Sequence, residues 1–235
     1  MCSMALHKDF VIKFAAKLRS KVAVASIVCV FLLVLLFPGQ FSAQSFVDKE
    51  MMQRLHQHYS QEAQRRGVAL NMLLKQLKGK EVNKQLIEVN RFFNQFKYKN
   101  DVDLWGRDDY WATPEEFIGV NSGDCEDYVI AKYFALRSLG VPDKQLYLTY
   151  VKTRHKNETH MVLSYISKID SVPLILDNFK PRILPSDKRP DLLSVYYFNV
   201  QSTVMSIAPD EQRNLSPEDK IMNSNWAQLL TKIKK

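Results

Sequence analysis

Three acidic side chains surround a single cysteine in the segment GDCEDY, which covers residues 123–128. Cys125 stands between Asp124 and Glu126, and Asp127 follows. The thiolate rather than the thiol is the nucleophile, and neighbouring negative charge disfavours the thiolate. The segment therefore leaves two interpretations. Either Cys125 is an inert buried side chain, or a nearby group offsets the carboxylates and makes its sulfur reactive.

The expected position of the cysteine at the start of a helix favours reactivity. An apolar stretch follows it as far as Gly140, so Asp124 is the natural N-cap and Cys125 the first helical residue. The unpaired N–H groups and the positive dipole end of a helix N-terminus both stabilise a thiolate. A nucleophilic cysteine also needs a histidine base that a third group holds in place.

A histidine and an aspartate further along the chain could meet this need. His160 begins one expected strand and Asp177 ends the next. If these strands form a hairpin that turns near residues 168–170, His160 directly faces Asp177. This register predicts a triad in which Cys125 is the nucleophile, His160 the base and Asp177 its orienting group. His155 competes as the base, although its surroundings, TRHKNET, indicate a solvated loop.

The acidic residues around the cysteine could bind a hard cation. Asp124 and Glu126 could act with Asp127 and with the acids of the preceding loop, Asp101, Asp103, Asp108 and Asp109. Calcium binds about six to eight oxygen atoms and would offset the negative charge beside the thiol. The spacing matches no EF-hand loop. The simpler alternative is that Asp124 caps the helix while Glu126 and Asp127 complement its dipole.

Periodicity indicates helices first and strands afterwards. The expected helices cover residues 46–67 with Gly67 as the end, 68–80, 81–98, a segment capped at Thr113, the cysteine helix, and a closing helix capped at Ser216. The expected strands cover residues 145–153, 160–166, 172–178 and 195–200. Short connections favour antiparallel hairpins. The order predicts an α+β class in which an antiparallel sheet packs on the cysteine helix.

The N-terminal 43 residues have the composition of a targeting segment. Five basic residues precede an uninterrupted apolar run over residues 22–37. This predicts a secretory signal peptide cut after Ala43, so that the rest of the chain is exported. An uncleaved membrane anchor is the alternative, because Phe41 fits poorly at a small-residue cleavage site. In either form the segment engages the membrane or the secretion machinery. We expect a helical lobe over residues 44–99 and a catalytic core over residues 100–235.

Charge and cysteine content argue against nucleic-acid binding and against an internal disulfide. The formal net charge is +8, but residues 1–43 hold five basic and one acidic residue, which leaves 28 basic and 24 acidic residues. No basic and aromatic stripe that could follow a phosphate backbone is evident, so nucleic-acid binding is not expected. Cys2 and Cys29 lie in the targeting segment, so Cys125 is alone in the exported part and has no disulfide partner there.

Four segments together resemble the bacterial transglutaminase-like cysteine proteinases of the LapG type. They are DYWATPEEFIGVNSGDCEDYVIAKYFAL, THMVLSYI, PLILDN and DLLSVYYFN, within about residues 85–200. The resemblance implies a periplasmic thiol protease with a papain- or transglutaminase-like core. It assigns Cys125 as nucleophile, His160 as base and Asp177 as orienting group. It also implies activity that needs calcium, with Asp124 and Glu126 as ligands.

The resemblance further implies substrates and partners. Members of the family cleave a large surface adhesin near its N-terminus, typically at a di-alanine site, which releases the adhesin from the outer membrane and disperses biofilm. An inner-membrane cyclic di-GMP receptor of the LapD type sequesters the protease. The same thiol chemistry leaves a transglutaminase or a deamidase as the alternative. The backbone N–H of Cys125, with Trp105 or Trp111, could stabilise the oxyanion.

Overall fold

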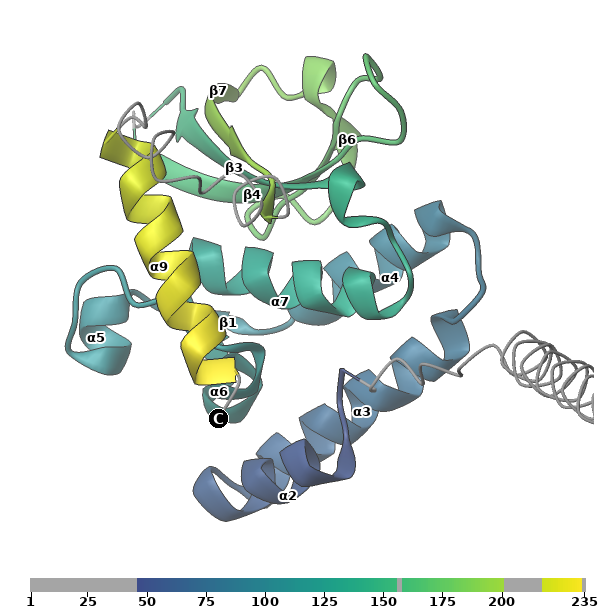
Figure 1. Ribbon diagram of the computed structural model, residues 1–235, viewed down its shortest axis with the longest axis vertical. Coiled ribbons are helices and arrows are strands. Elements are labelled where there is room, and N and C mark those ends of the chain that lie inside the picture. The colour runs from purple at the N-terminus through teal and green to yellow at the C-terminus, as the bar shows by residue number, and fades with distance from the viewer. Residues whose placement is uncertain (1–45, 156–157, 201–216, 234–235) are drawn as a thin grey trace, which may run out of the picture. The chain divides into compact units, whose positions relative to one another are not determined.

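The structure is a computed structural model that describes residues 46–155, 158–200 and 217–233 of the chain (Figure 1). The expected targeting segment, with the cut after Ala43, and the expected cap Ser216 lie outside these residues. In the part of the chain that is described, no helix combines the length and the apolar character that crossing a membrane requires.

The N-terminal region forms three helices, α2 (Lys49–His58), α3 (Gln61–Leu77) and α4 (Val82–Phe93). The prediction of one helix that ends at Gly67 is wrong. Helix α2 ends at His58 with Tyr59 as its C-cap, and the Ser60 side chain caps the start of α3. Gly67 lies inside α3. A Cβ atom at Gly67 would lie 2.6 Å from Cδ1 of Leu55, so glycine at this position allows α2 and α3 to pack closely.

The aromatic loop before the cysteine contains four short elements. They are β1 (Lys97–Tyr98), α5 (Asp101–Trp105), α6 (Pro114–Val120) and β2 (Ser122–Gly123). The expected cap at Thr113 is confirmed, because its side chain and that of Glu116 form a capping box. Parallel pairing of β1 with β2 places Tyr98 beside Gly123, immediately before the cysteine helix.

The cysteine helix α7 (Cys125–Ser138) begins at the expected residue. Val129, Ile130 and Ala131 are successive residues of α7 and all are buried, so the helix is covered on more than one face. It lies between α4 and the sheet, where β4 contacts it most extensively (Figure 1). The closing helix α9 (Pro217–Ile233) packs across α7 by stacking Trp226 on Phe134, with ring centroids 5.7 Å apart.

The sheet is antiparallel, with the strand order β6-β5-β4-β3-β7. Its strands are β3 (Leu146–Thr153), β4 (Thr159–Tyr165), β5 (Leu174–Leu176), β6 (Leu184–Pro185) and β7 (Leu192–Phe198). Apolar side chains of β3 and β4, among them Leu148 and Leu163, join the same core as α7. The predicted α+β class with a sheet packed on the cysteine helix is confirmed.

The register between β4 and β5 differs from the prediction. Leu163 pairs with Leu176, so Val162 rather than His160 lies opposite the position of Asp177. The difference is two residues. Because side chains alternate between the two faces of a strand, a shift of two keeps His160 and Asp177 on one face as diagonal neighbours.

Gly123 provides a test of the packing before the cysteine. A Cβ atom at this residue would lie 2.3 Å from Oδ2 of Asp127 and 2.8 Å from the ring of Phe117. Gly123→Ala is expected to lower the free energy of unfolding by about 1–3 kcal/mol, because both neighbours are fully buried and a methyl group would overpack them. Urea denaturation measures the change.

Gly79→Asn is the control for this substitution. Gly79 has a φ of +73° with nothing within 4 Å of a Cβ, and asparagine tolerates this left-handed conformation. Its denaturation midpoint should stay close to that of the wild type. Equal midpoints for Gly123→Ala and the wild type would contradict the close packing at Gly123.

Candidate active site

Cys125 lies at the first position of α7 and is half-buried. Its Sγ donates a hydrogen bond of 3.1 Å to Oε2 of Glu126. Burial, followed by the charges of Glu126 and Asp124, raises the pKa of the Cys125 thiol. The backbone N–H of Met161 acts in the opposite direction on that pKa, which places the thiol beside the start of β4. The side chains around the sulfur therefore favour the thiol over the thiolate.

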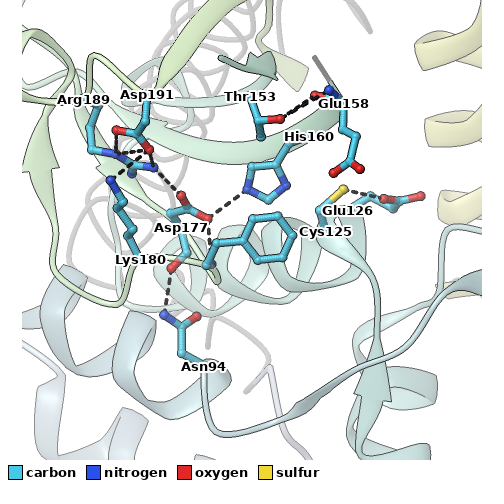
Figure 2. Close-up of polar contacts among 11 residues, drawn as sticks. Asn94, Cys125, Glu126, Thr153, Glu158, His160, Asp177, Lys180, Arg189 and Asp191 are labelled. Carbon is cyan, nitrogen blue, oxygen red and sulfur yellow. Dashed lines mark hydrogen bonds and ion pairs between the residues drawn. The ribbon is translucent and has the colours of Figure 1, made fainter. Parts of the chain in front are cut away.

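His160 and Asp177 form a buried pair beside the cysteine (Figure 2). His160 Nε2 lies 2.9 Å from Oδ1 of Asp177, and the exposed fraction of each residue is 1%. Phe179 stacks on the imidazole at a centroid distance of 4.2 Å. In Figure 2 the second ring nitrogen of His160 points toward the side on which Cys125 lies. The arrangement leaves that nitrogen available to the thiol.

The carboxylate of Asp177 is held from several directions. Its Oδ1 also accepts from the backbone N–H of Phe179 at 2.9 Å, and its Oδ2 accepts from Nη2 of Arg189 at 2.7 Å. The side chain of Asn94, the C-cap residue of α4, donates to the backbone carbonyl of Asp177 at 2.7 Å. Burial alone would raise the pKa of Asp177, but the bonds from His160, Arg189 and Phe179 outweigh it and lower that pKa to about 2.

His155, the competing base, is exposed on the connection between β3 and β4. The nitrogen that Asp177 holds belongs to His160 instead. The structure therefore brings His160 and Asp177 into contact and places Cys125 next to them (Figure 2). His155 lines a cavity together with Asp177 and Phe179, but the hydrogen bond to Asp177 is made by His160.

Three other carboxylates converge near the start of α7. Ligand atoms of Asp101, Asp124 and Asp127 lie within 4.8 Å of one another. One oxygen of each carboxylate is buried without a hydrogen-bond partner in the described part of the chain. The second oxygens of two of them accept backbone N–H groups, Asp101 from Tyr110 and Asp127 from Ala112 at 2.8 Å. Three partnerless oxygens thus point into one small space.

This acidic cluster fits a hard cation. Burial raises the pKa of Asp101 and of Asp127, and burial with the charge of Glu126 raises the pKa of Asp124 to about 9. Asp124 occupies the N-cap position, but its side chain makes no capping hydrogen bond. It contributes to the cluster and also interacts with the side chain of Glu126. Carboxylate oxygens are the ligands that calcium prefers, and a cation would satisfy all three.

Glu126 differs from the expectation drawn from the sequence. Its carboxylate lies against the Cys125 sulfur and outside the cluster, and burial raises its pKa to about 7. Helical geometry explains the difference, because Asp124 and Asp127 are three residues apart on one face whereas Glu126 is on another. Of the other loop acids, Asp103 is exposed and Asp109 accepts from Trp111 and Asn225.

The two tryptophans considered for the oxyanion have different surroundings. The indole N–H of Trp111 donates to Oδ1 of Asp109 at 3.1 Å and is therefore occupied. The ring of Trp105 packs on Tyr110 with centroids 4.9 Å apart. The indole N–H of Trp105 is buried and has no hydrogen-bond partner in the described residues. The N–H groups of the first turn of α7 also have no partner within that helix, so Trp105 and the backbone of Cys125 both remain candidate donors.

Comparison with known proteins decides the family. Residues 53–205 match the family described as bacterial transglutaminase-like cysteine proteinase BTLCP, which is more than half of the chain. The chain belongs to this family. Family membership establishes a transglutaminase-like cysteine proteinase, in agreement with the mixed fold and with the resemblance of the sequence.

Solved structures of LapG from Legionella pneumophila are similar to this proteinase. One is 38% identical, covers 80% of this chain and 97% of its own, and has a TM-score of 0.63. Calcium-bound LapG is 46% identical over 66% of this chain and 84% of its own, with a TM-score of 0.59. EGTA-treated LapG has the same identity and TM-score and covers 66% and 82%. No curated protein matches the sequence.

Some residues around the pair in this cysteine proteinase were not anticipated. Arg189, Asn94 and Phe179 all contact Asp177 or His160, yet each lies in a segment without a motif. Asp101 and Asp127 were among the possible ligands, but nothing in the spacing separated them from the other acids. A buried arginine followed by proline and aspartate, Arg-Pro-Asp, is the one local signal that could have been found.

Lys132 is a further unexpected residue beneath the pair. It lies on α7 with an exposed fraction of 0%, and its ammonium has no hydrogen-bond partner in the described residues. Burial lowers the pKa of Lys132 to about 7, although the charge of Asp177 acts against this. A cation in this environment reduces stability because it is poorly solvated.

Lys132→Met is expected to raise the free energy of unfolding by about 1–3 kcal/mol at pH 6, because it removes an unpaired buried polar group. Between pH 7 and the ordinary lysine value of 10.5, unfolded Lys132 holds a proton that the folded protein has lost. The stability of the wild type therefore rises with pH in this window, and the advantage of the variant shrinks.

Urea denaturation at several pH values measures this difference. Lys75→Met replaces an exposed lysine on α3. Its free energy of unfolding should change with pH in the same way as that of the wild type. If the difference in free energy of unfolding between Lys132→Met and the wild type stayed constant over the whole pH range, the lowered pKa of Lys132 would be contradicted.

Proposed function

We propose that this proteinase hydrolyses peptide bonds with Cys125 as nucleophile, His160 as general base and Asp177 as the group that orients the imidazole. The supporting observation is the buried hydrogen bond from His160 Nε2 to Asp177. It holds the imidazole in the tautomer whose other nitrogen accepts a proton from the sulfur. The position of Cys125 at a helix N-terminus favours the thiolate that results.

The reaction follows from these positions. His160 takes the thiol proton, and the thiolate attacks the carbonyl carbon of the scissile peptide bond. The backbone N–H of Cys125 faces the oxyanion of the tetrahedral intermediate. The C–N bond breaks as His160 gives its proton to the leaving amine, which leaves a thioester. Water, deprotonated by His160, hydrolyses the thioester and restores the thiol.

We further propose that Asp101, Asp124 and Asp127 hold a calcium ion. Their partnerless buried oxygens support the assignment, and one structure of LapG is calcium-bound. When bound, calcium supplies positive charge that offsets the carboxylates beside the thiol. Asp124 immediately precedes Cys125, so a cation that fixes the Asp124 carboxylate also fixes the first turn of the helix. This explains why negative side chains stand beside a nucleophilic cysteine.

The proposed substrate is a large outer-membrane-retained adhesin, cut near its N-terminus so that it is released and biofilm disperses. Similarity to LapG and the resemblance of the sequence support this proposal. The composition of residues 1–43 supports a periplasmic location, with that segment in contact with the membrane or the secretion machinery. A cyclic di-GMP receptor of the LapD type in the inner membrane is the proposed regulatory partner.

The test is incubation of the purified protein with an adhesin fragment, with calcium and with EGTA, followed by intact-mass analysis. Two fragments that appear only with calcium would support the proposal. A product in which glutamine has become glutamate, or is joined to an amine, would support the alternative deamidase or transglutaminase activity. An unchanged substrate in both conditions would contradict the proposed substrate.

A further inference from the structure

Arg189 is a buried arginine at the outer side of the catalytic pair. Its exposed fraction is 3%, and its Nη2 donates to Oδ2 of Asp177 at 2.7 Å. The other oxygen of Asp177, Oδ1, receives His160 at 2.9 Å. The carboxylate therefore lies between an imidazole and a guanidinium, with one oxygen directed at each (Figure 2).

A second carboxylate holds Arg189 in this position. Asp191 accepts from Nε of Arg189 at 3.1 Å and from Nη2 at 2.9 Å. Lys180 in turn lies 3.1 Å from Asp191. Figure 2 shows the resulting series of alternating charges, which runs from Lys180 through Asp191, Arg189 and Asp177 to His160. The guanidinium is thus aligned from behind and does not depend on Asp177 alone for its orientation.

The charge of His160 changes during the proposed reaction, whereas that of Arg189 does not. The imidazole is cationic after it takes the thiol proton and neutral after it protonates the leaving amine. A carboxylate that is almost fully buried beside a neutral imidazole would tend to take up a proton. Protonated Asp177 could donate to the ring nitrogen rather than accept from it, and His160 would then adopt the wrong tautomer. A guanidinium remains charged throughout.

Few charged groups contact the carboxylate of Asp177 itself, although His155, Lys180 and Asp191 line the same cavity. In the described part of the chain, His160 on β4 and Arg189 before β7 contact its carboxylate, and Lys132 on α7 acts on it from a longer distance. Lys132 has no hydrogen-bond partner among these residues, so it does not align the carboxylate. Arg189 is therefore the group that can supply both a fixed charge and a direction.

We propose that Arg189 is a positioning residue that keeps Asp177 ionised and aligned on His160 while the imidazole gains and loses its proton. The proposal rests on the proposed function of Cys125, His160 and Asp177 and adds a fourth member to it. Arg189 touches neither the substrate nor the sulfur and acts through Asp177.

A purely structural role is the alternative. Arg189 also bonds to Asp191 within the short connection between β6 and β7, which fixes the shape of that connection. In that case its loss would reduce stability and activity together, without changing the state of the imidazole. The two roles are separated by the tautomer of His160, which a structural anchor does not control.

The first part of the experiment compares three variants of the full-length protein in peptide-cleavage assays. Arg189→Gln keeps a donor but removes the charge, and kcat is expected to fall by about 10–100-fold with little change in KM. Arg189→Lys keeps the charge and should restore most of the loss. Arg54→Gln is the matched control, because Arg54 on α2 makes an equally well-formed pair with Glu115. Its kcat should stay within about twofold of the wild type.

The second part measures the imidazole directly. Nitrogen-15 NMR of histidine-labelled protein, with His160 assigned through its alanine variant, reports which ring nitrogen carries the proton. We expect neutral His160 to carry it on Nε2 in the wild type and in Arg189→Lys, and to lose this preference in Arg189→Gln. The measurement requires no substrate, so it distinguishes failure of this proposal from failure of the proposed protease activity.

Three results would overturn the proposal. One is an Arg189→Gln variant whose His160 spectrum and kcat equal those of the wild type. The second is a wild-type protein whose neutral His160 carries its proton on Nδ1, a result that holds even if Arg189→Gln does not fold. A fall in kcat with an unchanged His160 spectrum would likewise overturn it in favour of the structural role.

Discussion

Cys125→Ala is expected to abolish peptide cleavage while the fold persists. The variant removes the sulfur that forms the thioester, and without it only binding and oxyanion stabilisation remain. The rate should therefore fall by at least about 10⁴-fold. The side chain is half-buried and alanine is smaller, so no clash is introduced. Fragment release by mass spectrometry measures the activity, and circular dichroism with a thermal melt measures the fold.

A pair of histidine variants provides the control for this result. His160→Ala removes the base and should lose activity to a similar extent, whereas exposed His155→Ala should retain it. Residual cleavage by Cys125→Ala above that of His160→Ala would show that another nucleophile acts. Equal loss in both histidine variants would contradict the assignment of His160 as the base.

Removal of calcium is expected to have the second largest effect. The acidic cluster consists of the buried Asp101 and Asp127 and the half-buried Asp124. Without a cation, ionised carboxylates repel one another there, and the negative charge beside Cys125 disfavours its thiolate. Free calcium at about 100 times its Kd should stabilise the fold by about 2.7 kcal/mol and restore cleavage that EGTA abolishes. Because the carboxyls must lose their protons, affinity should rise with pH. Calorimetric titration and thermal melts measure both effects.

Two residues of α5 form the matched pair for the cation site. Asp101→Asn removes a charge from the cluster and should abolish the stabilisation by calcium. Asp103→Asn changes an exposed acid two residues away and should leave it intact. If Glu126→Gln alone removed calcium binding while Asp101→Asn retained it, the ligand set read from the sequence would replace the one proposed from the structure.

Local patterns in the sequence determined much of the architecture. The Thr113 capping box, the start of α7 at Cys125 and the positions of β3 and β4 all depend on neighbours within a few residues, so they can be recognised without the fold. The contact between His160 and Asp177 was also anticipated, although through the wrong register. The predicted contact is still correct because a register shift of two residues leaves both side chains on the same face of the sheet.

Other features were decided only by the tertiary structure. Gly67 was expected to end a helix, but the packing of Leu55 against it places it within α3. The sequence presents seven acids near the cysteine, and only the approach of α5 to α7 brings Asp101 to Asp124 and Asp127. Arg189 meets Asp177 in the same way, through the connection that leads into β7. Helix caps and hydrophobic periodicity depend on residues that are close in sequence. A buried charge instead depends on a distant segment that neutralises it, and that pairing exists only after the chain has folded.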